Sequence, residues 1–251
     1  MTLFFNSMTL TWRSLIKVKH SPEQLLDLTL QPIIFVIMFV YLFGGAVAGN
    51  QQAYLQFVLP GILCQSVIFA TVGTGVGLST DLSTGIFDRF RSMPIARAAP
   101  LAGTVLGDIC KYVTCLVVVL VFGTIIGFRI ETDPASALAA CALVMLFAFS
   151  LCWISAVMGL YISNPRSVQG MSFLFLFPLT FGSNVFVPAA TLPGWLQAWV
   201  RINPVTHLVS ATRGLMLGGP VVIPVFWTLV WTAGIFLVFA PIAVRKYRKT
   251  V

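Results

Sequence analysis

The chain has 251 residues, of which 58% are hydrophobic and only 9% are charged. Soluble globular proteins carry about 25% charged residues, so a chain this apolar cannot hide its surface in a water-soluble fold. Fifteen Lys and Arg residues against seven Asp and Glu residues give a formal net charge of +8. This composition excludes an ordinary soluble domain and indicates an integral membrane protein.

Six apolar segments follow one another along the chain, separated by polar, Gly-containing or Pro-containing breaks. Each is long enough to meet the roughly 17–25 residues that a helix needs to cross a hydrocarbon core of roughly 30 Å. Because lipid offers no partner for backbone N–H and C=O groups, segments of this length must be helices and not barrel strands. The sequence predicts a single all-α transmembrane domain over 1–251, with spans at Leu25–Phe43, Leu55–Leu78, Tyr112–Phe128, Ala135–Ile162, Met171–Val187 and Val221–Val244.

Basic residues concentrate in alternate connections between these spans. Twelve of the fifteen lie before the first span, between the second and third, between the fourth and fifth, or after the sixth. The opposite connections hold only Arg129, Arg201 and Arg213. By the positive-inside rule the side with twelve basic residues is cytoplasmic, which predicts that both termini lie in the cytoplasm. Topology and lipid headgroups account for the positive charge, and no nucleic-acid partner is expected.

The segment 1–24 is expected to form an amphipathic helix in the cytoplasmic interface. Its apolar side chains recur at helical spacing beside cationic ones: Phe4, Met8, Trp12, Leu15 and Ile16, with Arg13, Lys17 and Lys19. Such a helix either anchors the chain or docks against a soluble partner. No removable signal peptide is expected, because no continuous apolar core is followed by a small-residue cleavage site.

After the first two spans, which fall within 25–78, the cytoplasmic segment 79–100 is longer than a simple connection requires. Its apolar residues fall at i, i+4, i+8 and i+11, which predicts a short helix with one apolar face and one charged face. Those residues are Leu82, Ile86, Phe90 and Met93, with Asp88, Arg89 and Arg91 opposite. Asp81 or Ser83 could cap this helix, and Pro94 would end it.

Spans three to five fall within 101–187, and the external segment 188–220 follows them. It contains two helical patches, Pro193–Ile202 and Val205–Leu217, divided by Asn203 and Pro204, and neither is long enough to cross a membrane. Trp195 and Trp199 share one helical face, as expected for rings at the level of the headgroups. We expect a shallow re-entrant or interfacial helical hairpin, followed by the sixth span and a basic tail in 221–251.

The motifs of nucleotide and metal sites are missing from the sequence. It contains no GxxxxGK[ST], HExxH or CxxC pattern, so we expect no catalytic residue, bound cofactor or metal in this chain. The five cysteines lie in or beside apolar spans and are interpreted as buried apolar side chains. An intramembrane serine hydrolase would need His20 or His207 beside an activated serine, and the closest sequence, Gly170–Leu174, lacks the second glycine of the nucleophile elbow.

Asp108 and Lys111 lie three residues apart just before the predicted third span, where they can pair on one helical face. They are either a proton or substrate relay, since charges inside membranes often mark pathways, or a pair that snorkels near the headgroups. No other ionisable residue lies deep in the six spans, which argues against ion-coupled transport or a charge-lined channel. An uncharged pathway suits a hydrophobic or amphiphilic cargo, and the alternatives are a lipid-acting membrane enzyme and a secondary transporter.

Three stretches, in this order, resemble the membrane subunits of type-2 ABC exporters, and most closely the daunorubicin-resistance branch of drug and lipid permeases. The first is Gln31–Leu63, with QPIIFVIMFVYLFGG and YLQFVLPGIL, and the second is STDLSTGIFDRFRSMPIAR at Ser79–Arg97. The third, Leu192–Gly219, carries the N-P-[VL]-T and R-x-L-x-x-G patterns. The resemblance extends over nearly the whole chain.

The resemblance implies a permease subunit in a bacterial cytoplasmic membrane that exports a drug, an antibiotic or a lipid-like substrate. It implies a second permease subunit, as a homodimer or heterodimer, and two copies of a separate ATP-binding cassette subunit that would hold ATP and Mg. Coupling to that ATPase would involve Gly85, Ile86, Phe87, Asp88, Arg89, Phe90, Arg91, Pro94, Asn164 and Arg166. We expect the external hairpin to act as a gate through Trp195, Trp199, Asn203, Pro204 and Arg213.

Overall fold

The computed structural model describes residues 22–85 and 99–250. The described part of the chain is built from helices and contains no strand, which confirms the all-α class. In chain order the elements are α2 (Pro22–Ala48), α3 (Gln51–Ala70), α4 (Val72–Ser83), α6 (Ala99–Ile125), α7 (Pro134–Tyr161), α8 (Pro165–Phe181), the 3-10 turn η1 (Ala189–Thr191), α9 (Gly194–Ile202), α10 (Pro204–Leu217) and α11 (Val222–Thr250). Most of the expected amphipathic segment 1–24 lies outside the described residues.

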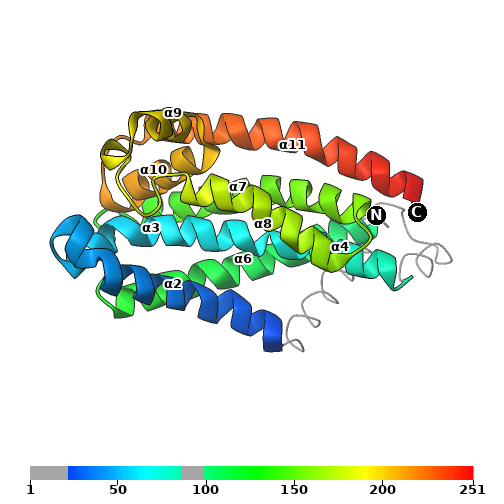
Figure 1. Cartoon of the computed structure of the whole chain (residues 1–251), viewed down its shortest axis with the longest axis horizontal. Helices are drawn as coiled ribbons and strands as arrows, with labels where there is room; N and C mark the ends of the chain where they lie inside the picture. Colours follow the sequence, from blue (N-terminus) through cyan, green and yellow to red (C-terminus); the bar gives the residue numbers. More distant parts are fainter. Residues whose placement is uncertain (1–21, 86–98, 251) are drawn as a thin grey trace.

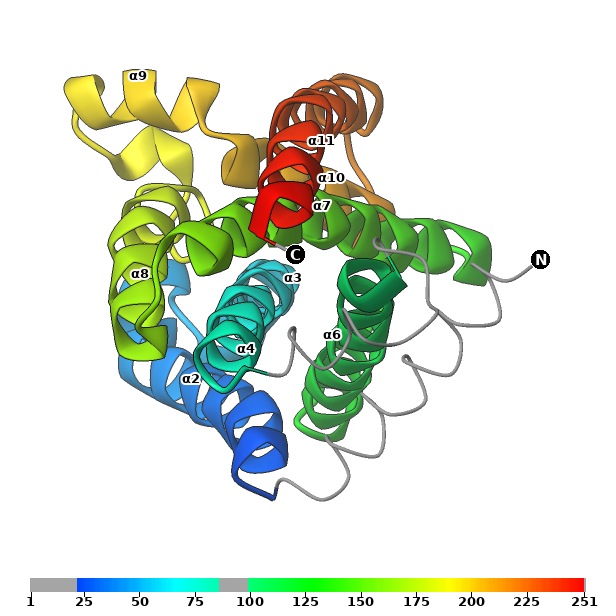
Figure 2. The same cartoon turned by 90° about the vertical axis from the view of Figure 1, so that its right-hand side faces the viewer.

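The long helices run side by side in an elongated bundle (Figure 1). One end carries α9 and α10 and is called the hairpin end; the other carries the last turns of α11 and is called the tail end. Seen from the tail end, α3 and α4 run through the middle of the bundle, with α2, α6, α7 and α8 around them and α11 outside α7 (Figure 2). The central path of α3 and α4 explains why their apolar side chains are largely buried.

Among the described residues, five helical stretches are long and apolar enough to cross a membrane: Leu28–Val47, Gln51–Ser83, Gly103–Ile125, Pro134–Tyr161 and Val222–Arg248. The expected fifth crossing is α8, and its 17 residues leave it outside this set. Large apolar side chains cover the outer faces of α2, α8 and α11, for example Leu42, Leu174 and Leu237. These are the surfaces that a hydrocarbon environment would cover.

Two helices begin six or more residues earlier than the sequence predicts. The helix α6 starts at Ala99 instead of Tyr112, so Asp108 and Lys111 lie inside it and not before it. Pairing with Lys111 makes a buried Asp108 tolerable, whereas the prediction ended the apolar segment at these charges. The helix α8 starts at Pro165 instead of Met171, because Asn164 caps it: its Oδ1 accepts from the Arg166 amide at 3.0 Å.

In the half of the bundle nearer the tail end, α4 and α7 cross with their backbones in contact. A Cβ atom on Gly75 would meet the Ser155 carbonyl oxygen, and one on Gly159 would meet the Gly75 carbonyl oxygen. Beside them, the Ser79 hydroxyl donates to the Ile162 carbonyl at 2.8 Å. Small residues four apart on both helices let the two backbones touch, which is a common way to join helices in membranes.

Candidate functional site

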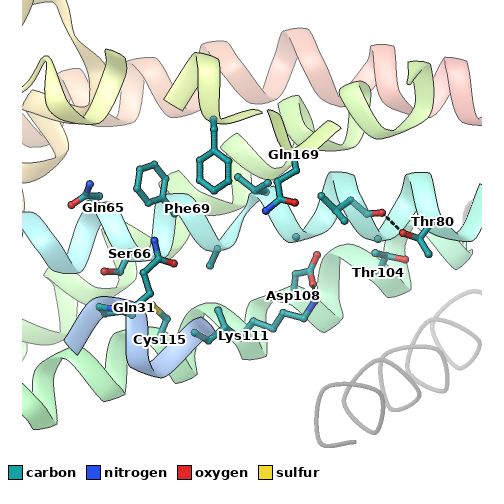
Figure 3. A pocket seen from close by; sticks show the side chains of 18 of the residues that line it. Gln31, Gln65, Ser66, Phe69, Thr80, Thr104, Asp108, Lys111, Cys115 and Gln169 are labelled. Atoms are coloured by element: carbon teal, nitrogen blue, oxygen red, sulfur yellow. Dashed lines mark hydrogen bonds and ion pairs between the residues drawn. The ribbon is translucent and has the colours of Figure 1, made fainter. Parts of the chain in front are cut away.

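A cavity of about 630 Å³ lies between α2, the α3–α4 rod, α6 and α8. Figure 3 shows side chains from α2, α3, α4, α6 and α8 around it. Its lining is amphiphilic: the rings of Phe35, Phe69 and Phe173 are joined by amide, hydroxyl and charged groups, namely Gln31, Gln65, Ser66, Thr80, Asp81, Thr104, Asp108, Lys111 and Gln169. Ligand pockets for drug-sized molecules have volumes of roughly 300–1,000 Å³, so the cavity is large enough for such a molecule.

An ion pair at the α6 wall is the charged centre of this cavity. The predicted pairing is confirmed: Lys111 Nζ lies 2.7 Å from Asp108 Oδ1. The Thr74 hydroxyl donates to the other carboxylate oxygen, Oδ2, at 2.6 Å, and the Tyr112 hydroxyl lies 3.1 Å from Thr74 Oγ1. Asp108 is only 3% exposed. The network therefore joins α4 to α6 inside the bundle, where each carboxylate oxygen has a partner.

Gln65 on α3 is the unusual polar residue of the lining. It is 2% exposed, yet neither its amide nitrogen nor its amide oxygen has a hydrogen-bond partner in the described part of the chain. A buried polar group left without a partner costs about 1–3 kcal/mol. No pattern in the sequence singles out Gln65, because only the fold brings it to this wall.

Asn203, one of the predicted hairpin residues, ties the hairpin to α8. Its side-chain Nδ2 donates to the carbonyls of Leu179 at 2.7 Å and Gly182 at 2.9 Å. Its Oδ1 accepts from the Val205 amide at 2.9 Å and so caps α10, with Pro204 in the first turn. The two predicted patches are confirmed as helices, and Asn203 forms the corner between them.

Arg213 lies inside the hairpin end and fastens α10 to α3. Its Nε donates to the Phe57 carbonyl at 3.1 Å, and its Nη2 donates to the Asn184 carbonyl at 3.2 Å. The guanidinium carbon lies 3.9 Å from the centre of the Phe57 ring. Burial lowers the pKa of Arg213 to about 10, which still leaves it charged at neutral pH. It is a structural clamp of the hairpin end.

Trp195 and Trp199 lie apart from these buried contacts, on the outer helix α9. Their side chains are 75% and 45% exposed. Trp199 still reaches the end of α8, because a Cβ atom on Gly182 would lie 2.8 Å from its Nε1 atom. Of the predicted gate residues, the structure thus brings Asn203, Pro204 and Arg213 into the bundle and leaves the two tryptophans on its surface.

Only some of the predicted coupling residues lie in the part of the chain that the structure describes. Gly85 lies at the tail end, two residues after the end of α4, with a φ of 69°, a conformation that favours glycine. The turn with Asn164 and Arg166 lies beside α4, as the hydrogen bond from Ser79 to Ile162 requires. Ile86, Phe87, Asp88, Arg89, Phe90, Arg91 and Pro94 lie outside the described residues.

Membrane-length helices around an amphiphilic cavity define the class of this protein as a membrane-spanning transport subunit. The profile of the ABC-2 type transporter family matches residues 6–217. The chain belongs to this family of ABC transporter permeases. Within 22–85 and 99–250, no group of three or more His, Cys, Asp or Glu residues is placed to hold a metal ion.

Curated relatives share most of their length with this chain. The daunorubicin resistance ABC transporter permease protein DrrB1 of Streptomyces coeruleorubidus is 45% identical over 244 residues, which cover 96% of this chain and 86% of the relative. The doxorubicin resistance ABC transporter permease protein DrrB of Mycobacterium tuberculosis is 31% identical over 83% of this chain and 77% of its own. The probable doxorubicin resistance permease DrrC of that organism is 27% identical over 87% and 79%.

Proposed function

We propose that this permease exports hydrophobic or amphiphilic compounds, such as drugs, antibiotics or lipid-like molecules, from the cytoplasm or the inner leaflet of the membrane. The relatives' names support a drug as cargo, since they refer to resistance to daunorubicin and doxorubicin. The observation that carries the proposal is the cavity of about 630 Å³, whose aromatic and amide lining suits an amphiphile.

The cavity also adjoins the element that would deliver mechanical work. Val72, Val76 and Thr80 of α4 line it, and α4 ends at Ser83, just before Gly85, the first residue of the segment expected to contact the ATPase. A movement of that segment would therefore pull on one wall of the cavity. In this proposal ATP and Mg are held and hydrolysed by a separate cassette subunit, present in two copies, and this chain supplies the pathway.

The proposed membrane arrangement has six crossings and both termini in the cytoplasm of a bacterial inner membrane. α8 supplies the fifth crossing, between those of α7 and α11, because it leads from the tail end to the hairpin end (Figure 1). The hairpin 188–220 would be re-entrant or interfacial on the outside, where the clamps at Asn203 and Arg213 fix it and the exposed Trp195 and Trp199 meet the headgroups. A second permease subunit completes the transporter.

Reconstitution tests this function directly. The permease, purified with its ATPase, is placed in liposomes, and ATP-dependent uptake of fluorescent daunorubicin into vesicles with the ATPase outside is measured. We expect uptake with ATP and Mg, and none with a non-hydrolysable ATP analogue. Equal uptake with both nucleotides would contradict the proposal, and a permease that fails to bind the ATPase would contradict the assembly.

A further inference from the structure

The helices α4 and α6 flank the segment that is expected to contact the ATPase. α4 ends at Ser83 and α6 begins at Ala99, so residues 84–98 connect the two helices directly. A displacement of this connection therefore acts first on the contact between α4 and α6. The bonds that hold these two helices together decide how such a displacement reaches the rest of the bundle.

α4 is held firmly on the side that faces away from α6. Its backbone meets the backbone of α7 at the crossing of Gly75 and Gly159. Nearer the tail end, Leu78 of α4 is buried in one apolar cluster with Tyr247 of α11. Backbone contacts and buried apolar surface of this kind cannot separate without leaving voids in a close-packed interior. α4 and α7 therefore form one unit.

α6 is fastened to α3 at the hairpin end. A Cβ atom on Gly123 would meet the Leu59 side chain, so the two helices lie close together there. The Gln52 side chain of α3 donates to the Gly127 carbonyl, two residues after α6, at 2.7 Å. Toward the tail end, α6 borders the cavity with side chains between Thr104 and Cys115 (Figure 3). The open space beside this half leaves α6 room to pivot about its fastened end.

The hydrogen bond from Thr74 to Asp108 joins the tail half of α6 to α4, and both of its partners have a substitute. If α6 moves away, the Asp108 carboxylate keeps its ion pair with Lys111, which belongs to the same helix. The Thr74 hydroxyl can turn to a carbonyl of its own helix, as threonines in helices do. Thr80 of α4 already makes such a bond to the Val76 carbonyl at 2.8 Å. Neither group is left unpaired, so the bond can open and close reversibly.

We propose that the hydrogen bond between Thr74 and Asp108 is a latch, which opens when ATP drives the coupling segment and lets the tail half of α6 swing away from α4. The two side chains thereby determine how tightly ATP hydrolysis is coupled to export, and Lys111 holds the carboxylate in place while the latch is open. The inference rests on the proposed function and adds the contact that moves during each cycle.

Distances between spin labels in the purified permease–ATPase complex in nanodiscs test the movement. In a background without native cysteines, Ser83→Cys on α4 and Val113→Cys on α6 form the reporting pair, and both positions are exposed. We expect their distance to lengthen when ATP and vanadate are added. Ser83→Cys with Tyr161→Cys, at the exposed end of α7, is the control pair and should keep its distance. An unchanged reporting pair, or an equal change in the control pair, would overturn the inference.

Substitution of Thr74 tests the latch itself. Valine has the shape of threonine without the hydroxyl, so Thr74→Val without nucleotide should shift the ratio of the two distances about tenfold toward the longer one. That is the change that the loss of one hydrogen bond to a charged group produces. Export of daunorubicin per ATP hydrolysed should fall several-fold, and Thr74→Ser, which keeps the hydroxyl, should behave like the parent. Thr114→Val is the matched control, because the Thr114 hydroxyl is exposed and bonds to the Cys110 carbonyl of its own helix.

The outcomes separate the latch from the proposed function. If Thr74→Val matches the parent in both distance and coupling, the bond is only a structural contact and the inference fails. Should Thr74→Val melt far below the parent, the reporting pair in the parent decides alone. A parent that exports daunorubicin without a change in the reporting pair keeps the proposed function and loses the latch. A parent that shows the change but does not export daunorubicin keeps the latch and loses the proposed cargo.

Discussion

Asn203 joins α8 to α10 through one small side chain. It caps α10 with its oxygen and holds the last turn of α8 with its nitrogen, while only 2% of its surface is exposed. Its environment demands an acceptor on one side and a donor on the other, and an amide is the side chain of this size that supplies both. The residue therefore does more than the N-cap role that the Asn-Pro pair suggests.

Substitution of Asn203 distinguishes these two roles. Asn203→Ala should destabilise the permease by about 2–3 kcal/mol, because it removes a cap and leaves two buried carbonyls without a donor. Asn203→Asp keeps the cap but turns a carboxylate toward the carbonyls of Leu179 and Gly182, so it should be no more stable than the alanine variant. Unfolding in mixed micelles measures both. An aspartate variant as stable as the parent would show that only the cap matters.

His207 gives the hairpin end a dependence on pH. Its ring stacks on Trp227, with centroids 6.0 Å apart, and burial lowers its pKa below the usual 6.5. Above pH 6.5 the imidazole is neutral in both the folded and the unfolded chain, and its contribution to the free energy of unfolding is fully present. As the pH falls below 6.5 the unfolded chain takes up the proton first, so stability is lost until the folded pKa is passed. Melting temperatures at pH 7.5 and 5.0 should differ less in His207→Gln than in the parent, and equal differences would contradict this assignment.

At the scale of helices, the crossing of α4 and α7 depends on two glycines. Gly159→Ala should separate these helices, because its Cβ atom would meet the Gly75 carbonyl, which belongs to backbone and cannot rotate away. Overpacking of this kind costs about 1–3 kcal/mol. Gly234→Ala on α11 is the control, since nothing lies within 4 Å of its Cβ position and it does not line the cavity. We expect a lower melting temperature and weaker export only in Gly159→Ala; equal behaviour would exclude a tight crossing.

The sequence predicts those helices well whose ends carry local signals. α7 is found within one residue at each end, since Asp133 and Pro134 mark its start and no charge interrupts it. The start of α6 was missed because an isolated Asp108 would end an apolar segment, and only the contacts with Thr74 and Lys111 make it acceptable. Asn203 and Arg213 could be selected from the sequence because they belong to the N-P-[VL]-T and R-x-L-x-x-G patterns. Gln65, Gly75 and Gly159 have no local signal, because their importance comes from neighbours distant in sequence.

The coupling segment, which begins at Gly85 just after the end of α4, remains a prediction at the scale of helices. If its apolar stripe contacts the ATPase, Phe87→Ala and Phe90→Ala should reduce co-purification of the ATPase or uncouple ATP hydrolysis from transport. A buried aromatic side chain contributes roughly 1.5–3 kcal/mol, and an exposed ion pair about 0.2–1 kcal/mol, so Arg89→Ala should have a milder effect. Normal assembly and export in all three variants would mean that the segment is only a solvated connection.

At the scale of the whole molecule, the two ends of the bundle differ in charge. The tail end carries Arg166 and the basic last turns of α11, where Lys246 lies 4.5 Å from the Tyr161 ring and Tyr247 is buried against α4 and α7. At the hairpin end the guanidinium of Arg213 donates hydrogen bonds to the Phe57 and Asn184 carbonyls inside the protein. The fold thus gathers at one end the cationic groups that the positive-inside rule assigns to the cytoplasm.

Cysteine labelling in intact cells tests this orientation. In a background without native cysteines, Gln51→Cys and Ala189→Cys place a thiol at the hairpin end, and Thr84→Cys places one at the exposed end of α4 at the tail end. An impermeant maleimide should label the first two from outside and should reach Thr84→Cys only after the membrane is permeabilised. The opposite pattern would invert the topology. Because the cavity lies beside α4 and α6, it would then face the outside, and the segment after Gly85 could no longer meet a cytoplasmic ATPase.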